Sequence, residues 1–345
     1  MISTTLLDWY DANARPMPWR VPPAQSRAGI KPDPYHIWLS EVMLQQTTVA
    51  AVVNYFTTFR ARWPNVHALA NAADTDVMGE WAGLGYYARA RNLLKCARII
   101  STEYDGHFPS TEANLIRLPG IGPYTAAAIS AIAFDQPSTV LDANVERVIS
   151  RLYAIAEPLP DSKPTLHGLA ANLTPTHRPG DYAQAIMDLG ATICGQKPDC
   201  KLCPLATDCE GLKQGISDEL PKKRPKPVKP VRYGIVYFAY REDGTILFET
   251  RPAKGLLGGM MALPTTDWTE TEAIEMPPIN ANWQALVTPV KHTFTHFHLV
   301  LTVLTTTVVD VSPTRGWFEI PDATTAGKLP TVMRKAYLAA MRNRG

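Results

Sequence analysis

The stretch Leu115–Val148 constrains the fold of this chain more than any other part of its sequence. A helix-like segment ends at Pro119, Gly120-Ile121-Gly122 makes a tight turn, and a new helix begins near Pro123. Proline suits the first turn of a helix, because its missing N–H would have no helical partner there in any case. Two glycines separated by one residue leave backbone N–H groups free beside a helix N-terminus, where they bind a phosphate oxygen. The pattern therefore predicts two helices joined by a phosphate-binding turn at Gly120 and Gly122.

Two carboxyl groups in predicted helices are candidates for chemistry. Asp142 stands at the N-cap of the expected helix Ala143–Tyr153, where N–H donors and the helix dipole should lower its pKa. Glu41 lies in a helix expected to start at Asp33-Pro34 and to run through Gln46, among apolar neighbours that should raise its pKa. The plainer alternatives are a structural cap for Asp142 and a solvated Glu at the edge of an amphipathic helix for Glu41.

Together the two carboxyl groups predict a specific reaction class. One carboxyl group held neutral and one held ionised is the arrangement that cleaves glycosidic bonds through an oxocarbenium-like state. In this interpretation Glu41 protonates the leaving group and Asp142 stabilises or traps the sugar cation. Asn144 orients either the attacking water or Asp142 itself.

A glycine-rich segment, Trp81–Asn92, is a candidate for contact with DNA. Its turn should expose Leu84 and Tyr86 ahead of a helix that carries Arg89 and Arg91. Aliphatic and aromatic side chains can enter a base stack while arginines hold phosphates. The alternative is a pair of buried tyrosines that pack the loop between two helices.

Four of the five cysteines form a cluster with the spacing Cys194-x5-Cys200-x2-Cys203-x5-Cys209. Such crowding predicts a metal site in a reducing compartment and argues against a disulfide framework. Zinc and an iron–sulfur cluster both accept four cysteines, so the spacing alone leaves both open. The net charge of +2 is too small to predict nucleic-acid binding, so any basic surface must be local. Neither a signal peptide nor an apolar run long enough for a membrane span is found.

Composition changes sharply after residue 219. The segment LPKKRPKPVKPVR, from Leu220 to Arg232, has four prolines and six basic residues and is expected to be a semi-rigid linker. Beyond it, strands are expected at Arg232–Tyr240, Thr245–Thr250, Trp283–Val290 and His298–Val309. The predicted organisation is a mainly helical domain at 1–219, a linker at 220–231 and an α+β domain at 232–345.

Several strings resemble one known family. LPGIGPYTA resembles the helix-hairpin-helix of DNA base-excision glycosylases, and SEVMLQQT (Ser40–Thr47) resembles the catalytic-acid helix of MutY-type adenine DNA glycosylases. The likeness implies that Glu41 protonates N7 of a flipped adenine. Related bifunctional enzymes that resemble endonuclease III carry a lysine where this chain has Tyr124, which implies base removal without strand cleavage. The family sequence LDGNV reads LDANV here, with Ala143.

The same resemblance assigns expected roles to further residues. The adenine pocket would contain Trp19, Arg20, Leu44, Val49 and Gln184. The duplex wedge and the 8-oxoguanine contacts would come from Gln46, Thr47, Leu84, Tyr86, Thr295 and His296. The four cysteines would hold a structural [4Fe–4S] cluster, although the family spacing is x6-x2-x5. The segment Arg251–Met260 resembles a MutT-like C-terminal domain, and no glutamate-rich REXXEE helix is present, so that domain should recognise DNA without hydrolysing nucleotides.

The sequence thus predicts a helix-hairpin-helix DNA glycosylase with a [4Fe–4S] loop and a C-terminal MutT-like (Nudix-like) domain. Its expected activity is monofunctional excision, in base excision repair, of adenine mispaired with 8-oxoguanine or guanine after base flipping. The alternatives are a bifunctional glycosylase/lyase and a non-catalytic protein that binds DNA lesions. The expected partner is double-stranded DNA with such a mismatch, and the expected state is a cytoplasmic, nucleoid-associated monomer.

Overall fold

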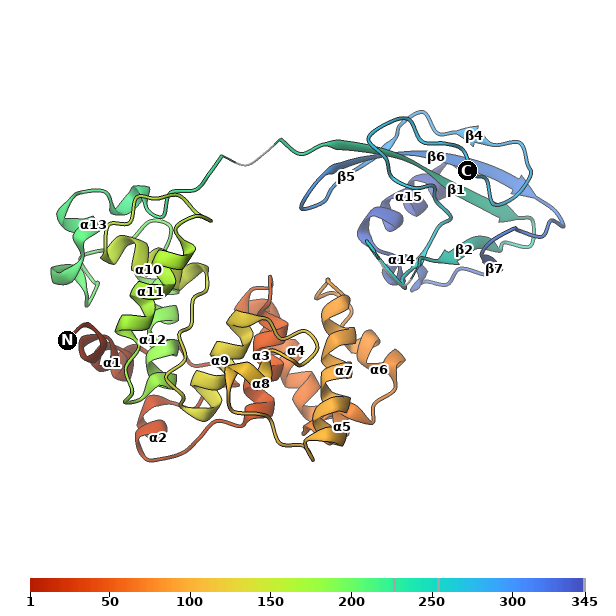
Figure 1. Cartoon of the computed structure of the whole chain (residues 1–345). Coiled ribbons are helices and arrows are strands. Elements are labelled where there is room, and N and C mark those ends of the chain that lie inside the picture. Colours follow the sequence, from red (N-terminus) through yellow and green to blue (C-terminus); the bar gives the residue numbers. More distant parts are fainter. Residues whose placement is uncertain (226–227, 253–254, 344–345) are drawn as a thin grey trace. The chain divides into compact units, whose positions relative to one another are not determined.

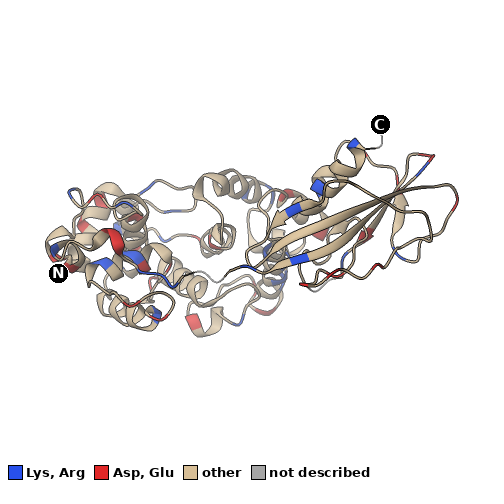
Figure 2. Ribbon diagram, turned by 90° about the horizontal axis from the view of Figure 1, so that it is seen from above, with Lys and Arg blue, Asp and Glu red and all other residues tan. Residues whose placement is uncertain are grey.

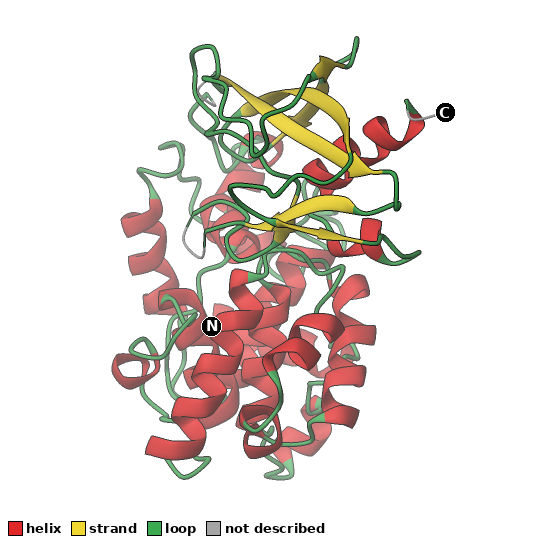
Figure 3. Ribbon diagram, turned by 90° about the vertical axis from the view of Figure 1, so that its right-hand side faces the viewer, coloured by secondary structure: helices red, strands yellow, loops and turns green. Residues whose placement is uncertain are grey.

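The computed structural model describes residues 1–225, 228–252 and 255–343. The chain divides into two compact units, Met1–Pro225 and Lys226–Gly345 (Figure 1). The first unit is built of helices and the second around a β-sheet, as the red and yellow elements of Figure 3 show. Basic and acidic residues are interspersed along the ribbon of both units (Figure 2), in keeping with the small net charge of the chain.

The helical unit begins with four α-helices: α1 (Ile2–Asn13), α2 (Pro23–Arg27), α3 (Pro34–Leu44) and α4 (Val49–Arg62). The elements around the two turns that were predicted to contact DNA are α5 (Val66–Ala70), α6 (Asp74–Glu80), α7 (Ala88–Glu103), α8 (Glu112–Leu115), α9 (Pro123–Phe134) and α10 (Ala143–Leu152). The unit ends with α11 (Lys163–Leu173), α12 (Pro179–Thr192) and α13 (Glu210–Lys213), and with 3-10 turns at Ala206–Asp208 and Ser217–Glu219.

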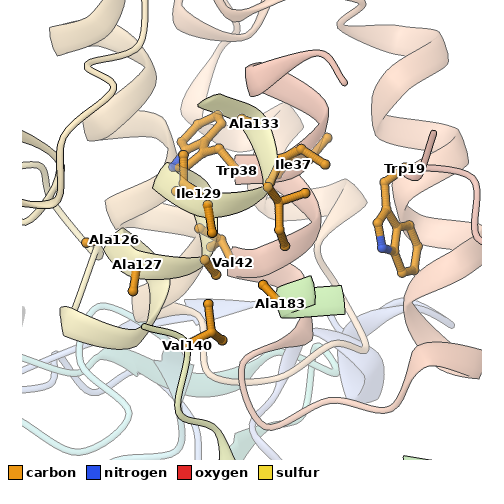
Figure 4. Packing of buried hydrophobic residues seen from close by; sticks show 14 of the residues in the cluster. Trp19, Ile37, Trp38, Val42, Ala126, Ala127, Ile129, Ala133, Val140 and Ala183 are labelled. Atoms are coloured by element: carbon orange, nitrogen blue, oxygen red, sulfur yellow. The ribbon is translucent and has the colours of Figure 1, made fainter. Parts of the chain in front are cut away.

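The core of the helical unit is centred on α9. Its residues from Thr125 to Ala133 are all buried, which is the pattern of a helix surrounded by other helices. Figure 4 shows Trp38 and Val42 of α3 beside Ile129 of α9. On another side of α9, α12 packs so closely that a Cβ at Gly180 of α12 would lie 2.6 Å from the carbonyl oxygen of Ala131 of α9. This packing fixes α3, α9 and α12 relative to one another.

Helix ends follow the expected capping chemistry, with two differences. Asp33 caps α3 by accepting a 2.8 Å hydrogen bond from the Tyr35 N–H, and Asp142 caps α10. However, α3 ends at Leu44 and not at Gln46, because Gln46 has a left-handed backbone with φ of 59°. Residues 21–31 contain the short helix α2, which was not predicted and begins with Pro23 at its first position.

The beginning of the predicted linker belongs to the helical unit. Leu220 is 2% exposed, and the Leu159 N–H donates to the Lys222 carbonyl at 2.8 Å. The Arg224 N–H in turn donates to the Leu159 carbonyl at 3.1 Å. An apolar side chain and two backbone hydrogen bonds therefore hold residues 220–224 on the helices, while Lys226 and Pro227 lie outside the described residues.

The second unit is a mixed sheet with helices. Its described residues form seven strands: β1 (Val231–Arg241), β2 (Ile246–Thr250), β3 (Met261–Ala262), β4 (Gln284–Ala285), β5 (Val290–Thr293), β6 (His298–Val308) and β7 (Trp317–Glu319). The path runs β3-β2-β1-β6-β4, with β5 on β6 and β7 on β2. Only the β1–β6 pair is parallel among these pairings, in register from Val231 opposite His298.

Helices α14 (Thr325–Lys328) and α15 (Thr331–Arg342) complete this unit. Helix α15 was not predicted; its Met333 and Tyr337 are buried in the core with Phe238 and Phe248. The strand expected over Trp283–Val290 is reduced to β4 and the start of β5, separated by a segment that contains Pro289. Ala253 and Lys254 of the MutT-like segment lie outside the described residues. Within the described part of the chain, every helix is too short or too polar to cross a membrane.

Candidate active site

One cavity in the helical unit collects all the residues that were predicted for catalysis and for the adenine pocket. Its volume is about 550 Å³, within the ordinary range for small-ligand sites. Helices α3, α9, α10 and α12 and the segment after α1 supply its walls. The predicted residues that line it are Trp19, Arg20, Glu41, Leu44, Gln46, Thr47, Val49, Tyr124, Asp142, Asn144 and Gln184. The two carboxyl groups, which are 101 positions apart in the sequence, thus lie on the same cavity.

Glu41 is a buried acid on α3. It is 6% exposed, and burial raises its pKa from 4.5 to about 7, with a further contribution in the same direction from the charge of Asp142. The Tyr124 hydroxyl and the Arg20 charge act in the opposite direction. Its Oε2 accepts no hydrogen bond from the described residues, while the Tyr124 hydroxyl lies 3.5 Å from the Met187 sulfur. Glu41 is therefore a neutral or half-ionised acid near neutral pH.

Asp142 is held by three hydrogen bonds at the start of α10. Its Oδ1 accepts from the N–H groups of Asn144 at 2.9 Å and Val145 at 2.8 Å, and its Oδ2 accepts from Asn144 Nδ2 at 2.8 Å. Burial nevertheless raises the pKa of Asp142, because desolvation outweighs these donors. The expected lowering of its pKa is therefore wrong in direction. Ala143 occupies the first helical position of α10, so the replacement of the family glycine requires no left-handed backbone.

A buried ion network supports Arg20. The carboxylate of Asp188 on α12 accepts from Arg20 Nη1 at 2.7 Å and Nη2 at 3.0 Å, and from Arg15 Nε at 2.6 Å. The Asp188 side chain is fully buried, so its charge offsets both arginines at the cavity wall. Arg20 is near enough to Glu41 to lower the pKa of that acid. The roles of Arg15 and Asp188 were not predicted, since nothing in the sequence shows that residues 15 and 188 meet.

The residues expected to contact DNA near the cavity differ from the prediction at two positions, Leu84 and Arg89. Gln46 and Tyr86 are exposed, as a duplex wedge requires, and Tyr86 is 55% exposed. Leu84 is only 7% exposed and packs in the core, so it is not available as a wedge in this structure. Arg89 is 9% exposed and donates to backbone carbonyls, so the expected phosphate contact is also wrong. Arg91 has no hydrogen bond or ion pair from its side chain to the part of the chain described.

The glycine turn precedes α9 as predicted. Gly120 has a φ of 78°, in the region that favours glycine, and a Cβ there would lie 2.9 Å from the Asn92 Cβ. Gly122 is the N-cap of α9, and no side chain caps this helix. The N–H groups of Gly122 and Tyr124 have no acceptor among the described residues. Free donors at a helix N-terminus are the chemistry that binds a phosphate oxygen.

The four clustered cysteines line a second, small cavity. Arg151 is buried beside it and donates to the Cys194 sulfur at 3.3 Å and to the Gly195 carbonyl at 2.6 Å. Burial raises the pKa of Cys203 to about 11, so this thiol needs a cationic centre nearby in order to ionise near neutral pH. No set of three or more Cys, His, Asp or Glu side chains in the described ranges is placed for a single metal ion. Four cysteine sulfurs around one cavity are a ligand set that both zinc and an iron–sulfur cluster accept.

Arg147 connects the cysteine loop to the acid site. Its Nε donates to the Cys194 carbonyl at 2.7 Å, and its Nη2 donates to Asn144 Oδ1 at 3.0 Å. Gly190 permits this arrangement, because a Cβ there would lie 2.7 Å from the Asn144 Cβ. Nothing in the amino-acid sequence indicates this connection.

The second unit presents its predicted residues at a hairpin tip. Thr295 and His296 are exposed between β5 and β6, and the Phe294 N–H donates to the Phe297 carbonyl at 2.9 Å to close the turn. The rings of Phe294 and Phe297 lie 4.9 Å apart, and the Arg232 guanidinium lies 4.6 Å from the Phe297 ring. These contacts pack the base of the turn that carries the two polar side chains.

Comparison with known proteins agrees with this geometry. Residues 39–170 match the HhH-GPD superfamily of base excision DNA repair proteins, and residues 236–339 match the NUDIX domain. Adenine DNA glycosylase of Homo sapiens is 34% identical over 96% of this chain and 72% of its own length. The enzyme of that name from Buchnera aphidicola (subspecies Schizaphis graminum) is 33% identical over 87% of this chain and 85% of its own length.

Solved structures support the fold of the helical unit. A thermostable thymine-DNA glycosylase superposes with a TM-score of 0.54 at 27% identity, over 62% of this chain and 95% of its own. Endonuclease III in a non-covalent DNA complex superposes with a TM-score of 0.51 at 22% identity over the same shares, which supports the fold alone. From the acid pair in one cavity, the two matching domains and relatives aligned along nearly the whole chain, we conclude that this protein belongs to the adenine DNA glycosylase family.

Proposed function

We propose that this glycosylase is monofunctional and removes adenine that is mispaired with 8-oxoguanine, or with guanine, in double-stranded DNA. The observation that carries the proposal is the pair of carboxyl groups on one cavity, with the pKa of Glu41 near 7. An adenine inside a duplex cannot reach this cavity, so the nucleotide must first leave the base stack.

In the proposed mechanism, Glu41 donates its proton to N7 of the extrahelical adenine. Protonation makes the base a better leaving group, and the N-glycosidic bond breaks with positive charge on the sugar. Asp142 stabilises this cation or bonds to it, and its three hydrogen-bond donors hold the carboxyl group in a fixed position on the cavity. Water, oriented by Asn144, then adds its oxygen to the sugar carbon and displaces Asp142 where a bond has formed. The proton that this water loses restores the neutral acid at Glu41.

The adenine is held by the remaining residues of the cavity. Trp19, Leu44 and Val49 supply apolar surface to the base, and Gln184 offers an amide with both donor and acceptor to its edge. Tyr124 packs beside the nucleotide and interacts with Glu41. The carboxylate of Asp188 neutralises Arg20 and so limits how far the charge of Arg20 lowers the pKa of Glu41.

Duplex DNA is held and opened by the rim. The turn of Gly120 and Gly122, with the free N–H groups of Gly122 and Tyr124, and the guanidinium of Arg91 contact the phosphate backbone. Gln46, Thr47 and Tyr86 enter the space left by the adenine and lie beside its partner base. Thr295 and His296 read 8-oxoguanine; replacement of both by alanine should reduce the preference for A:8-oxoguanine over A:G while excision from A:G continues.

Cys194, Cys200, Cys203 and Cys209 hold a [4Fe–4S] cluster that keeps the loop with the exposed Lys197 and Lys201 folded against DNA. The cluster takes no part in base removal. Purified protein should be brown and contain iron and acid-labile sulfide in equal amounts; a colourless zinc protein would contradict the assignment. We further propose that the protein acts as a monomer in the cytoplasm, associated with the nucleoid.

A lyase activity is disfavoured by the composition of the cavity. Strand cleavage through a Schiff base needs a lysine, and the described residues that line the cavity include none. The test incubates the protein with an A:8-oxoguanine duplex, measures released adenine, and adds borohydride in parallel. We expect adenine release without a trapped adduct. Efficient trapping would establish a lyase, and no release of adenine would leave a lesion-binding protein.

A further inference from the structure

The side chain of Arg89 joins two loops at the mouth of the cavity. Its Nη1 donates to the carbonyls of Val42 at 3.1 Å and Met43 at 2.8 Å, in the last turn of the helix that carries Glu41. Its Nη2 donates to Thr47 Oγ1 at 3.1 Å and to the Leu84 carbonyl at 3.0 Å. The last carbonyls of a helix lack helical partners, so Arg89 satisfies α3 while it reaches both loops.

The two loops that Arg89 joins are strained at the residues proposed to enter DNA. Gln46 has a φ of 59° and Tyr86 a φ of 49°, in the left-handed region that non-glycine residues rarely adopt. Both side chains are exposed, so they gain little from local packing. Such conformations persist only when the surrounding structure imposes them. Arg89 supplies part of that constraint, and its guanidinium also lies 5.6 Å from the Tyr86 ring.

The same helix face is tied to the glycine turn. Asn92, one turn after Arg89 on α7, packs against Gly120, where no Cβ would fit. From the other side, Gln45 Nε2 donates to Thr125 Oγ1 at 3.2 Å. The loop after α3, the Tyr86 loop and the phosphate-binding turn are therefore linked through side chains near the start of α7.

We propose that Arg89 is a positioning residue that fixes Gln46 and Tyr86 relative to each other and to α3 before DNA binds. The inference rests on the proposed function and adds to it a device for base extrusion. Loops that are already ordered need not lose conformational freedom when the duplex is opened, which lowers the cost of extrusion. Arginine is required because its planar fork has donors at two ends, whereas a lysine ammonium is a single point.

The experiment measures single-turnover adenine release by the full-length protein and by Arg89→Lys. One duplex carries adenine opposite 8-oxoguanine, and the other carries the same adenine opposite an abasic-site analogue, where no pair has to be broken. We expect Arg89→Lys to slow release about tenfold or more from the paired duplex and less than about threefold from the other. Equal losses on both duplexes, or no loss, would overturn the proposal.

Salt dependence separates positioning from phosphate binding. For Arg91→Gln, the control, the slope of log affinity against log salt should fall by about one, as for a lost phosphate contact. For Arg89→Gln the slope should not change, and a fall of about one would overturn the proposal. If the Arg89 variants do not fold, Thr47→Val removes one of the acceptors of Arg89 and should give the same selective loss with smaller size. An unaltered protein that releases adenine from neither duplex would refute the proposed function itself.

Discussion

Replacement of Glu41 by glutamine should greatly slow adenine release and stabilise the protein at the same time. Burial raises the pKa of Glu41 from 4.5 to about 7, so the native state favours the neutral carboxyl group. The rise corresponds to about 3 kcal/mol, since one pKa unit is about 1.36 kcal/mol. Between pH 4.5 and about 7 the native protein binds more protons than the unfolded chain, so the free energy of unfolding falls as the pH rises through this range. Above pH 7 the native state of the unaltered protein carries the full free-energy cost of the buried, ionised Glu41 carboxylate.

Glutamine resembles the neutral acid at every pH and avoids this cost. At pH 8.5 we expect Glu41→Gln to raise the free energy of unfolding of the helical unit by up to about 3 kcal/mol. Below pH 4.5 the difference in the free energy of unfolding between the variant and the unaltered protein should vanish. In the activity assay, the substitution should slow adenine release by about 10²- to 10⁴-fold. Scanning calorimetry of the intact protein at both pH values measures the effect. A stabilisation of this size corresponds to a rise in Tm of roughly 6–12 °C.

The control is Glu103→Gln, an exposed glutamate at the end of α7, which should change stability by less than about 0.5 kcal/mol. If Glu41→Gln is instead destabilised equally at both pH values, the carboxyl group is not kept neutral by burial, and the reasoning fails.

Three further substitutions test the support of the site. Asp188→Asn leaves the buried charge of Arg20 uncompensated, so unfolding should become about 3 kcal/mol easier in a denaturant titration, and a loss under about 1 kcal/mol would contradict this. Gly190→Ala drives a Cβ into Asn144 and should cost about 1–3 kcal/mol together with activity; unchanged kinetics would show that the close approach is not needed. Gly168→Ala, inside α11 with no atom within 4 Å of the new Cβ, is its matched control and should stabilise by about 0.5–1 kcal/mol.

Local chemistry explains which parts of the structure could be predicted from the sequence. Asp33-Pro34 and Asp142 predict helix starts because a cap bonds N–H groups within its own turn, and the structure has both caps. The alanine-rich run of α9 predicts a closely packed helix, and its residues are buried. The family strings then placed the adenine-pocket residues, which line one cavity.

The remainder depends on contacts between distant segments. In the sequence, nothing distinguishes Arg89 from a surface arginine that follows an exposed tyrosine. Only the fold shows that it donates to backbone carbonyls of α3. The pKa of Asp142 reverses its expected direction because desolvation by neighbouring helices exceeds the local effect of its donors. Asp188 carries no local mark of its two arginine partners. Helix α15 could be predicted only by knowing that a sheet needs a cover for its apolar face.

The pH dependence of single-turnover adenine release tests the central claim most directly. If a neutral Glu41 delivers the proton, the rate must fall on the alkaline side with an apparent pKa of about 7, roughly tenfold for each further pH unit. Arg20 lowers the pKa of Glu41, so Asp188→Asn, which leaves that charge unbalanced, should move the fall to lower pH. A rate that stays constant from pH 6 to 9, or that falls already near pH 4.5, would contradict the assignment of Glu41 as the acid.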